Sequence, residues 1–441
     1  MANGPQFIKR ILEPKIKPKE ITFEMPPDTA YQKEFIEGLG FLPFVWYNAF
    51  QIENQNISFF KLYTIENLPT LEISFKDVYG TMKNQGTPLD DSILTVYINP
   101  RTKNLKPIHM DFKIVSFSEL SGLYKITGVV DVSPLYIKGY KSYSKKTSFG
   151  LFKDVCNELG LGFNSNIDDT DDKMTWINTG DRLITFLNTV LQNVYKSDET
   201  FLYAYMDFMY AFNYVDIEKE LKRDIKEELG VSNTGIQELT KVKDSEATSR
   251  LMLTNDANFI ETNIYFEKYE IINNSTSISL KKGYLTKLKY YDELSKNFLV
   301  FNVDSLMSDL STSIPLKGKV KDENFWKQNI NLVYEGKFDI DNVHKNFKYA
   351  PIQNQINYAE MDKIKMILTM KTPNYNLYRF QKIFVYLSNQ VNSMSSPLVN
   401  PRLTGEWLIS DISYVSVGSS YRQKIEVTRR DLQLSKEESG N

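Results

Sequence analysis

The sequence has only one cysteine and two histidines, and these scarcities exclude several kinds of chemistry. A lone Cys156 cannot form an intrachain disulfide, and one chain cannot build a thiolate zinc site around it. His109 falls in an alternating strand pattern and His344 in a polar segment, so we expect no Ser-His-Asp or Cys-His catalytic arrangement. There is no run of roughly 18 apolar residues that would span a bilayer. The N-terminus also lacks the apolar core of a signal peptide, so we expect synthesis in a reducing cytoplasm and no membrane association.

Charge and glycine patterns exclude further functions. The 53 basic and 55 acidic residues leave a net charge of −2, so no global field attracts the chain to nucleic acid. Gly160-Leu-Gly lacks the third glycine of a dinucleotide-binding loop, and Gly318-Lys319 lacks the context of a phosphate-binding loop. We therefore expect no enzyme, no catalytic residue, no cofactor and no specific binding of nucleic acid.

The acidic run Asp168-Asp169-Thr170-Asp171-Asp172 is the one candidate for a metal site. Carboxylate oxygens suit hard cations, but Lys173 stands where a calcium loop requires glycine, and the closing glutamate is missing. A solvated loop is favoured over a metal site, and we expect no bound metal.

Residues from about 57 to 131 alternate with period two. Leu71, Ile73 and Phe75 alternate with polar residues, and the pattern recurs in the following segments. Several short strands at this spacing predict an antiparallel sandwich or barrel. The later members of the series are Leu94, Val96, Ile98, Met110, Phe112, Ile114, Tyr124, Ile126 and Val130.

The period then changes to that of helices. Ser148 is a candidate N-cap for a helix that ends at Gly160, and Thr179 for a helix that buries residues from 183 to 194. Aromatic residues from 201 to 216 predict a tight hairpin that turns near Asp207. The charged stretch that follows predicts an exposed helix over 217–229 and a mobile linker to 249.

Strand patterns resume at 251 and end in a hairpin from Arg402 to Arg430, with its turn at Gly418 to Ser420. The sequence thus predicts a β-rich α+β protein with two antiparallel barrels separated by a small α/β insert and a charged linker. The expected divisions are a proline-rich arm (1–34), a first barrel (35–140), the insert and linker (141–250), a second barrel with an irregular insertion at about 305–358 (251–433), and a disordered tail (434–441).

Five prolines in residues 1–34 prevent a long helix and favour an extended arm. Two interpretations stay open. The arm is either a partly disordered terminus or a segment that crosses onto a neighbouring subunit.

The order of these parts resembles the baseplate hub proteins of contractile-tailed phages. The resemblance rests on a Ser- or Thr-started helix ending in Leu159-Gly-Leu161, on Trp176, on the helix from Asp181, and on the closing hairpin. It covers most of residues 57–433, whereas the arm and residues 217–250 have no counterpart. The residues of the closing hairpin that carry it are Leu403, Gly405, Trp407, Leu408, Gly418, Arg429 and Arg430.

The resemblance implies two tail-tube-like barrels in one chain. Three copies would then present six similar barrels and adapt a threefold central spike to a sixfold tail tube, around a channel for DNA. The implied partners are the chain itself as a homotrimer, a tail tube or tube-initiator protein, the central spike, and the baseplate wedge and tape-measure proteins. The implied location is the tail baseplate of a virion.

Two other functions stay open at this point. A carbohydrate- or receptor-binding tail protein is also β-rich and aromatic-rich. A peptidoglycan hydrolase would need a carboxylate pair, and no pair stands out in the sequence.

Overall fold

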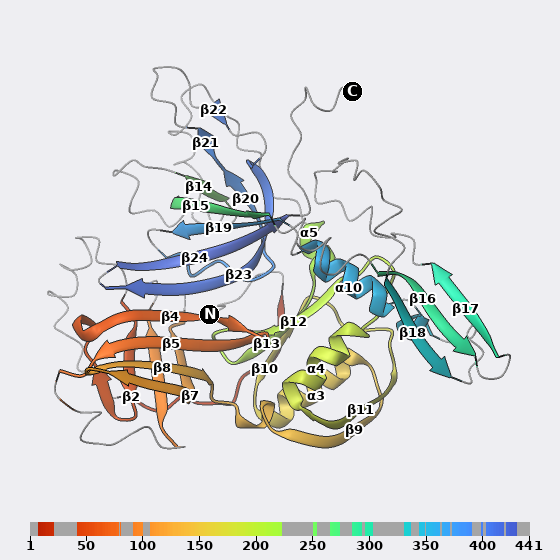
Figure 1. The fold of residues 1–441 in the computed structure, drawn as a ribbon, viewed down its shortest axis with the longest axis horizontal. Helices are drawn as coiled ribbons and strands as arrows, with labels where there is room; N and C mark the ends of the chain where they lie inside the picture. Colours follow the sequence, from red (N-terminus) through yellow and green to blue (C-terminus); the bar gives the residue numbers. More distant parts are fainter. Residues whose placement is uncertain are drawn as a thin grey trace.

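A computed structural model describes most of the regular elements of the chain (Figure 1). The described residues are 8–21, 42–78, 80, 91–99, 106–222, 250–253, 265–273, 285–292, 296–302, 330–336, 344–348, 350–361, 364–370, 373–389, 398–399, 403–418 and 420–429. Strands dominate and a few helices gather in the middle of the sequence, so the expected β-rich α+β class is confirmed.

The first β series, together with two short strands that precede it, forms seven consecutive strands of a thirteen-stranded sheet. Leu71, Ile73 and Phe75 are buried as the alternation predicts, and Leu94, Val96 and Ile98 are buried on the next strand of the sequence. Among the described residues β3 does not pair back with β4, so this half is a curved sheet rather than a closed ring of hydrogen-bonded strands. In sheet order the strands are β4 (Ile57–Ile65), β5 (Leu68–Lys76), β8 (Leu123–Val130), β7 (Ile108–Leu120), β6 (Ile93–Ile98), β2 (Phe44–Tyr47) and β3 (Phe50–Ile52).

The other six strands of the sheet close into a barrel, because β20 pairs with β23 as well as with β14. Most neighbours are antiparallel, but β14 pairs in parallel with both β15 and β20. In order the strands are β20 (Lys382–Tyr386), β14 (Arg250–Leu253), β15 (Tyr265–Asn273), β19 (Ile364–Met370), β24 (Ser420–Arg429) and β23 (Gly405–Val417).

The two halves meet edge to edge where β23 pairs antiparallel with β4. The pairing runs from Tyr414 opposite Leu62 to Val417 opposite Phe59. The two β units therefore share one hydrogen-bonded sheet, although they lie far apart in the sequence.

The insert contains a four-stranded sheet, a two-stranded ribbon and two main helices (Figure 1). The predicted hairpin is confirmed: Asp207 Oδ1 accepts hydrogen bonds from the amides of Met209 and Ala211 in its turn. The elements are β9 (Lys138–Lys146), α3 (Ser148–Leu159), β10 (Gly162–Ser165), β11 (Met174–Arg182), α4 (Leu183–Gln192), β12 (Leu202–Met206), β13 (Ala211–Asp216) and α5 (Ile217–Leu221).

Both predicted helix N-caps in the insert are wrong. Thr147, not Ser148, is the N-cap of α3, and its side chain accepts a hydrogen bond from the amide of Gly150. Thr179 does not cap α4, because it belongs to the preceding strand β11, and the N-cap is Arg182. The predicted C-cap Gly160 is confirmed, with a left-handed φ of 70°.

The start of the charged stretch is also not the exposed helix that its composition predicts. In α5 Glu218 and Glu220 are buried, and Glu220 Oε1 accepts from the amide of Lys382 on the second barrel at 3.3 Å. Side chains that satisfy backbone donors of a neighbouring element can be buried despite their charge. Residues 223–249 of the predicted linker lie outside the described part.

Residues 8–21 of the N-terminal arm lie on their own chain. Strand β1 (Lys9–Leu12) pairs with β10 and completes the sheet β1-β10-β13-β12. Farther along, the amide of Lys15 donates to the carbonyl of Gly160 at 2.7 Å, and the amide of Lys19 donates to Asp111 Oδ2 at 2.7 Å. The described part of the arm therefore connects the insert to the first sheet by hydrogen bonds to both.

Two strands that were expected to continue the second barrel, β16 and β17, form a separate sheet beside the insert, together with β18 from the expected irregular insertion (Figure 1). Strand β16 pairs antiparallel with β17 and parallel with β18, so none of the three is hydrogen-bonded to the barrel. The insertion into the barrel is thus larger than the sequence predicts. Its elements are β16 (Leu285–Asp292), β17 (Asn297–Asn302), β18 (Ile330–Gly336), α9 (Lys345–Lys348) and α10 (Ala350–Met361); the short pair β21 (Ser388–Asn389) and β22 (Leu398–Val399) follows.

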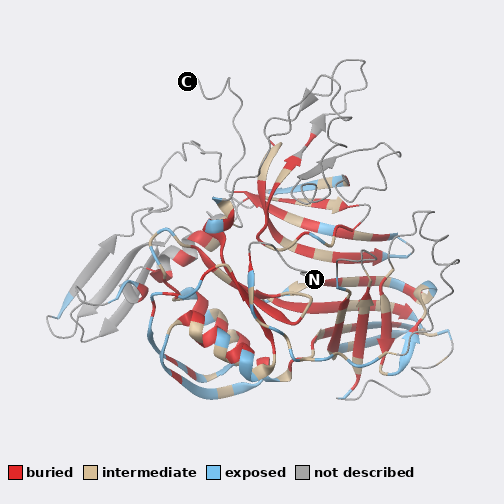
Figure 2. Ribbon diagram, turned by 180° about the vertical axis from the view of Figure 1, so that it is seen from behind, coloured by how far each residue is buried: buried red, intermediate tan, exposed pale blue. Residues whose placement is uncertain are grey.

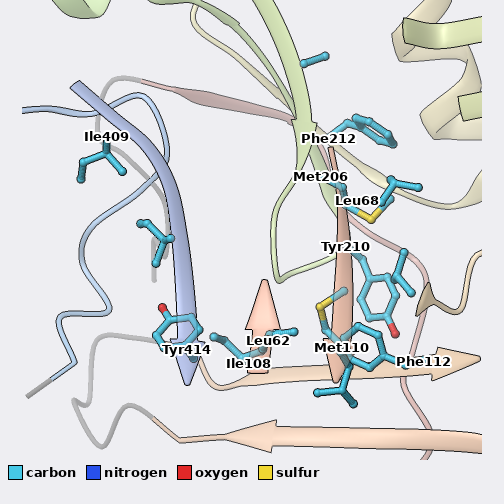
Figure 3. Packing of buried hydrophobic residues seen from close by; sticks show 14 of the residues in the cluster. Leu62, Leu68, Ile108, Met110, Phe112, Met206, Tyr210, Phe212, Ile409 and Tyr414 are labelled. Carbon is cyan, nitrogen blue, oxygen red and sulfur yellow. The ribbon is translucent and has the colours of Figure 1, made fainter. Parts of the chain in front are cut away.

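One large hydrophobic cluster runs through both sheets and the insert (Figure 2). Figure 3 shows Tyr210 of the insert hairpin beside Met110 and Phe112 of the first sheet, and Tyr414 of β23 close to Leu62 of β4. Packing, and not only the β23–β4 pairing, therefore joins the three parts. Within the described residues, no helix has the length and apolar character needed to cross a membrane.

Candidate functional site: the closing hairpin and a three-way joint

The base of the closing hairpin is anchored in the core of the second barrel. Trp407 is 1% exposed, and its Nε1 donates a hydrogen bond to the carbonyl of Leu403 at 2.8 Å. The guanidinium carbon of Arg429, itself buried, lies 5.0 Å from the centre of the Trp407 ring. Gly405, with a φ of 138°, begins β23 between Leu403 and Trp407. A cation over an indole in a dry environment is a strong contact, so Trp407 and Arg429 fix the two strands to each other.

The turn of the hairpin lies at the opposite end, where the two sheets meet. The amide of Gly418 donates to the carbonyl of Ser58 in β4 at 3.0 Å. Gly418 has a φ of 59°, a conformation that favours glycine, and the adjacent Val417 is exposed. Of the seven hairpin residues named from the sequence, five lie together at the base of the hairpin and Gly418 lies at its turn, whereas Arg430, like Ser419, lies outside the described residues.

A β-bulge in β23 leaves one backbone carbonyl outside the pairing with β24, and a nearby arginine binds it. The pairing of β23 with β24 shifts between Ile409 and Asp411, which leaves Ser410 as the extra residue. Arg379, on the segment before β20, donates from Nε to the carbonyl of Ser410 at 2.6 Å. The neighbouring amide of Phe380 donates to the carbonyl of Ile409 at 2.7 Å. The bulge and the Arg379 segment therefore hold each other in place.

The same arginine connects the second barrel to the insert. Its guanidinium carbon lies 5.2 Å from the ring of Tyr203 and 5.1 Å from the ring of Tyr205, both on β12. The Tyr205 hydroxyl donates back to the carbonyl of Arg379 at 3.2 Å. Arg379 thus contacts the insert through both its charge and its backbone.

The first sheet reaches this point through Asn67, in the turn between β4 and β5. Its φ of 67° is left-handed, which asparagine tolerates better than most residues. Asn67 Oδ1 accepts from the Tyr203 hydroxyl at 2.7 Å and from Arg379 Nη1 at 3.4 Å. Its carbonyl accepts from the amide of Met206 at 2.9 Å. We call Asn67, Tyr203, Tyr205, Arg379 and Ser410 the three-way joint.

Two clefts flank the joint, the smaller mainly apolar and the larger mainly polar, and both are bordered by Arg379 and Asp411. Their volumes are about 160 Å³ and 360 Å³, which is room for several water molecules. Burial raises the pKa of Asp411, and the positive charge of Arg379 opposes that rise. In the larger cleft, Lys365 Nζ pairs with Glu426 Oε1 at 2.7 Å. These carboxylates have protein partners, so the geometry favours a structural role for them.

The composition of the acidic run predicted a fully solvated loop, but one of its carboxylates is buried. Asp168, Asp169 and Asp171 are exposed, but Asp172 is buried. Asp172 accepts hydrogen bonds from the amide of Ser148 at 2.8 Å and from the amide of Tyr195 at 3.1 Å. It therefore fixes the first turn of α3 to the end of α4, and burial raises its pKa against these hydrogen bonds. Across the described ranges no three His, Cys, Asp or Glu side chains are grouped as metal ligands would be.

Sequence reasoning missed the three-way joint. A Glu66-Asn67 pair between two alternating segments is a turn signal that places Asn67 at a strand end. Nothing in the sequence around Arg379 marks it, because its partners lie on β12 and on a bulge whose position is set only by the folded sheet.

The chain has partial structural similarity to several known proteins, and no family model and no curated protein matches its sequence. The 43 kDa tail protein of prophage MuSo2 from Shewanella oneidensis is 8% identical with a TM-score of 0.47, over 88% of this chain and 98% of that one. A tail protein from Neisseria meningitidis MC58 is 8% identical with a TM-score of 0.48, over 88% of this chain and 96% of that one. A chain of the Francisella PdpA–VgrG complex is 11% identical with a TM-score of 0.43, over 91% of this chain and 61% of that one. All three TM-scores are below 0.5, so none of these likenesses determines what this chain does.

Proposed function

We propose that this protein is a structural hub in the tail of a contractile phage or a related injection machine. Three copies form a ring that joins a threefold spike below to a sixfold tube above and leaves a central channel for DNA. Catalysis has no part in this proposal. The partners are other copies of the chain, a tube or tube-initiator protein and a spike protein, with wedge and tape-measure proteins as further candidates at the baseplate.

One observation carries the proposal: a single chain contains two β units of similar size that share one sheet. Six strands form the closed half and seven the curved half, and the insert packs against both. Two β units per chain are what a trimer needs to offer six similar positions around one axis, and closed rings require contacts that repeat from copy to copy. The order of motifs along the sequence, from the first β series to the closing hairpin, supports the same assignment.

The closing hairpin has a specific place in this proposal. Trp407 and Arg429 secure its base, while the turn at Gly418 and the exposed Val417 lie at the edge shared by the two sheets. We propose that this turn contacts the ring stacked above or below.

The test is the mass of the purified protein, measured by sedimentation velocity, alone and with its spike protein. The proposal predicts a trimer in at least one of the two samples, and negative-stain images should show a ring. A stable monomer in both samples would contradict it.

A tail-associated carbohydrate- or receptor-binding protein remains the second candidate, because the smaller cleft is lined by several tyrosines, including Tyr205, Tyr375 and Tyr414. Aromatic walls suit sugar rings. Binding to a glycan array by a protein that stays monomeric would favour this function over the hub.

A further inference from the structure

Exposed apolar side chains gather in two patches on the described surface. The first lies at the turn between β7 and β8 and contains Val78, Leu120 and Leu123, with Leu120 at 77% exposure. The second lies on the β9–β11 ribbon of the insert and contains Ile137, Tyr140 and Ile177, with Tyr140 at 85% exposure. Single exposed apolar residues are ordinary, but grouped ones mark contact surfaces. We call them the tip patch and the ribbon patch.

The tip patch is held in one conformation. Leu120 and Leu123 are a cross-strand pair that flanks a two-residue turn, Ser121-Gly122, whose φ angles of 53° and 78° suit a tight hairpin. The amide of Asp77 donates to the carbonyl of Gly122 at 3.1 Å, which brings the end of β5 and Val78 alongside. A preorganised apolar tip loses little conformational entropy when it binds.

The ribbon patch is one face of a two-stranded sheet. Tyr140 lies opposite Thr179, and Ile177 lies opposite Ser142, in the antiparallel register of β9 and β11. These four side chains are exposed and uncharged, while the other face packs on the insert through buried Trp176. At one end of the ribbon, Lys138 lies opposite Arg182, so two cations border the uncharged face.

The two patches lie at opposite ends of strand β8 and the segment that follows it. The tip patch begins β8, and residues 131–137 lead from the end of β8 to the ribbon at the lower edge of the insert (Figure 1). Figure 2 shows pale blue, exposed surface along the ribbon. One chain therefore carries two exposed apolar patches on different parts of its surface.

We propose that the tip patch of one copy packs on the ribbon patch of the next copy, head to tail around the ring. A second copy is the fitting occupant, because a closed ring needs two different complementary surfaces on each subunit. Glu119, exposed beside the tip, has the charge opposite to Lys138 at the ribbon, whereas Arg182 already pairs with Glu66 of its own chain at 3.5 Å. This inference rests on the proposed ring and identifies the surfaces that form it.

Cysteine cross-linking tests the contact cleanly, because the only native cysteine, Cys156, is buried. Leu120→Cys and Ile177→Cys proteins are mixed in equal amounts and treated with a short bis-maleimide. The expected product is a cross-linked dimer in the mixture and none with either variant alone. A chain carrying both substitutions should cross-link through to a closed trimer.

The matched control replaces Ile177→Cys by Phe50→Cys, an exposed apolar position on β3 outside both patches. Equal cross-linking in that mixture, or cross-linking of one variant with itself, overturns the head-to-tail contact. A second variant, Leu120→Asp, should weaken trimer formation by about tenfold or more, because it places a charge where the proposed contact would bury the exposed Leu120 side chain. Unchanged trimer formation in that variant would also overturn the contact.

Sedimentation of the unmodified protein, alone and with spike, separates the two possible failures. A trimer without the specific cross-link leaves the proposed function standing and rejects these surfaces. A monomer under every condition rejects the ring and this contact together.

Discussion

Removing the side chain of Arg379 should loosen the three-way joint. The guanidinium donates to the carbonyl of Ser410 at 2.6 Å and lies 5.2 Å and 5.1 Å from the rings of Tyr203 and Tyr205. A hydrogen bond from a charged group contributes about 1.5–3 kcal/mol, and a partly desolvated cation–π contact about 1–2 kcal/mol. The contacts share one side chain and do not add fully. We therefore expect Arg379→Ala to lower the local free energy of opening by about 3 kcal/mol.

Amide hydrogen exchange is the appropriate assay, because a chain with several packed parts need not unfold in one step. The amides to follow are those of Phe380 and Ile409, which donate to Ile409 and Gln381 at 2.7 Å and 2.9 Å. Three kcal/mol corresponds to about a hundredfold loss of protection at these two amides. The amide of Ile425, in the β24 strand of the barrel core, should keep its protection and serves as the internal reference.

Two further variants separate the contributions of charge and shape. Arg379→Lys keeps the charge but not the planar fork, so it should recover only part of the protection. A double-mutant cycle with Tyr203→Leu should give a coupling of about 1 kcal/mol between the two side chains. Wild-type protection of Phe380 and Ile409 in Arg379→Ala would refute the view that this arginine holds the joint.

Three other substitutions give distinct expected outcomes. Trp407→Ala should destabilise the barrel by about 3–5 kcal/mol in urea denaturation, because it empties a fully buried site, whereas Trp407→Phe should cost clearly less; equal midpoints for both would contradict a packing role. Gly128→Ala should cost about 1–3 kcal/mol, because its new methyl group would lie 2.9 Å from Phe112 Cβ, whereas Gly139→Ala meets no atom within 4 Å and should be close to neutral in the same assay. Burial raises the pKa of Asp411, so the folded state binds a proton on this carboxyl more tightly than the unfolded state does. The stability that this proton binding contributes is present below the usual pKa of an aspartate and is lost as pH rises through the raised pKa of the folded state. Asp411→Asn should therefore gain stability relative to the wild type as pH rises above about 4, and a pH-independent difference in urea midpoints would argue against it.

The strands of the first sheet could be predicted because their alternation has one cause. One face of each strand is buried, so Leu71, Ile73 and Phe75 repeat with period two and the pattern is visible in the sequence. The same reasoning found the hairpin at Asp207 and the stop at Gly160, where turn chemistry is local. Features that depend on three or four neighbouring residues are accessible from sequence alone.

Features that depend on partners far away in the sequence were not accessible. The sequence patterns at 285–302 resemble those of the barrel strands, but β16 pairs with β17 and β18, so these strands form a separate sheet. The charge of Glu220 predicts exposure, yet the amide of Lys382 on another element accounts for its burial. Thr147 and Ser148 are both good cap residues by type. Asp172 accepts hydrogen bonds from the amide and the hydroxyl of Ser148, so Thr147 is the residue that caps the helix. In each case a contact between distant segments overrides the local preference.

The joint bears directly on the proposed ring, because two β units can take similar places around one axis only if each chain holds them at a fixed relative orientation. The β23–β4 ladder is short, with four residue pairs from Tyr414–Leu62 to Val417–Phe59, and a single short ladder would act as a hinge. The three-way joint adds a second attachment beyond the other end of β4, where Asn67 binds Tyr203 and Arg379. Two attachments separated along one strand resist rotation that either alone would permit. The relative orientation of the β units is thus built into the monomer, and assembly of a ring would need to supply only the contacts between copies.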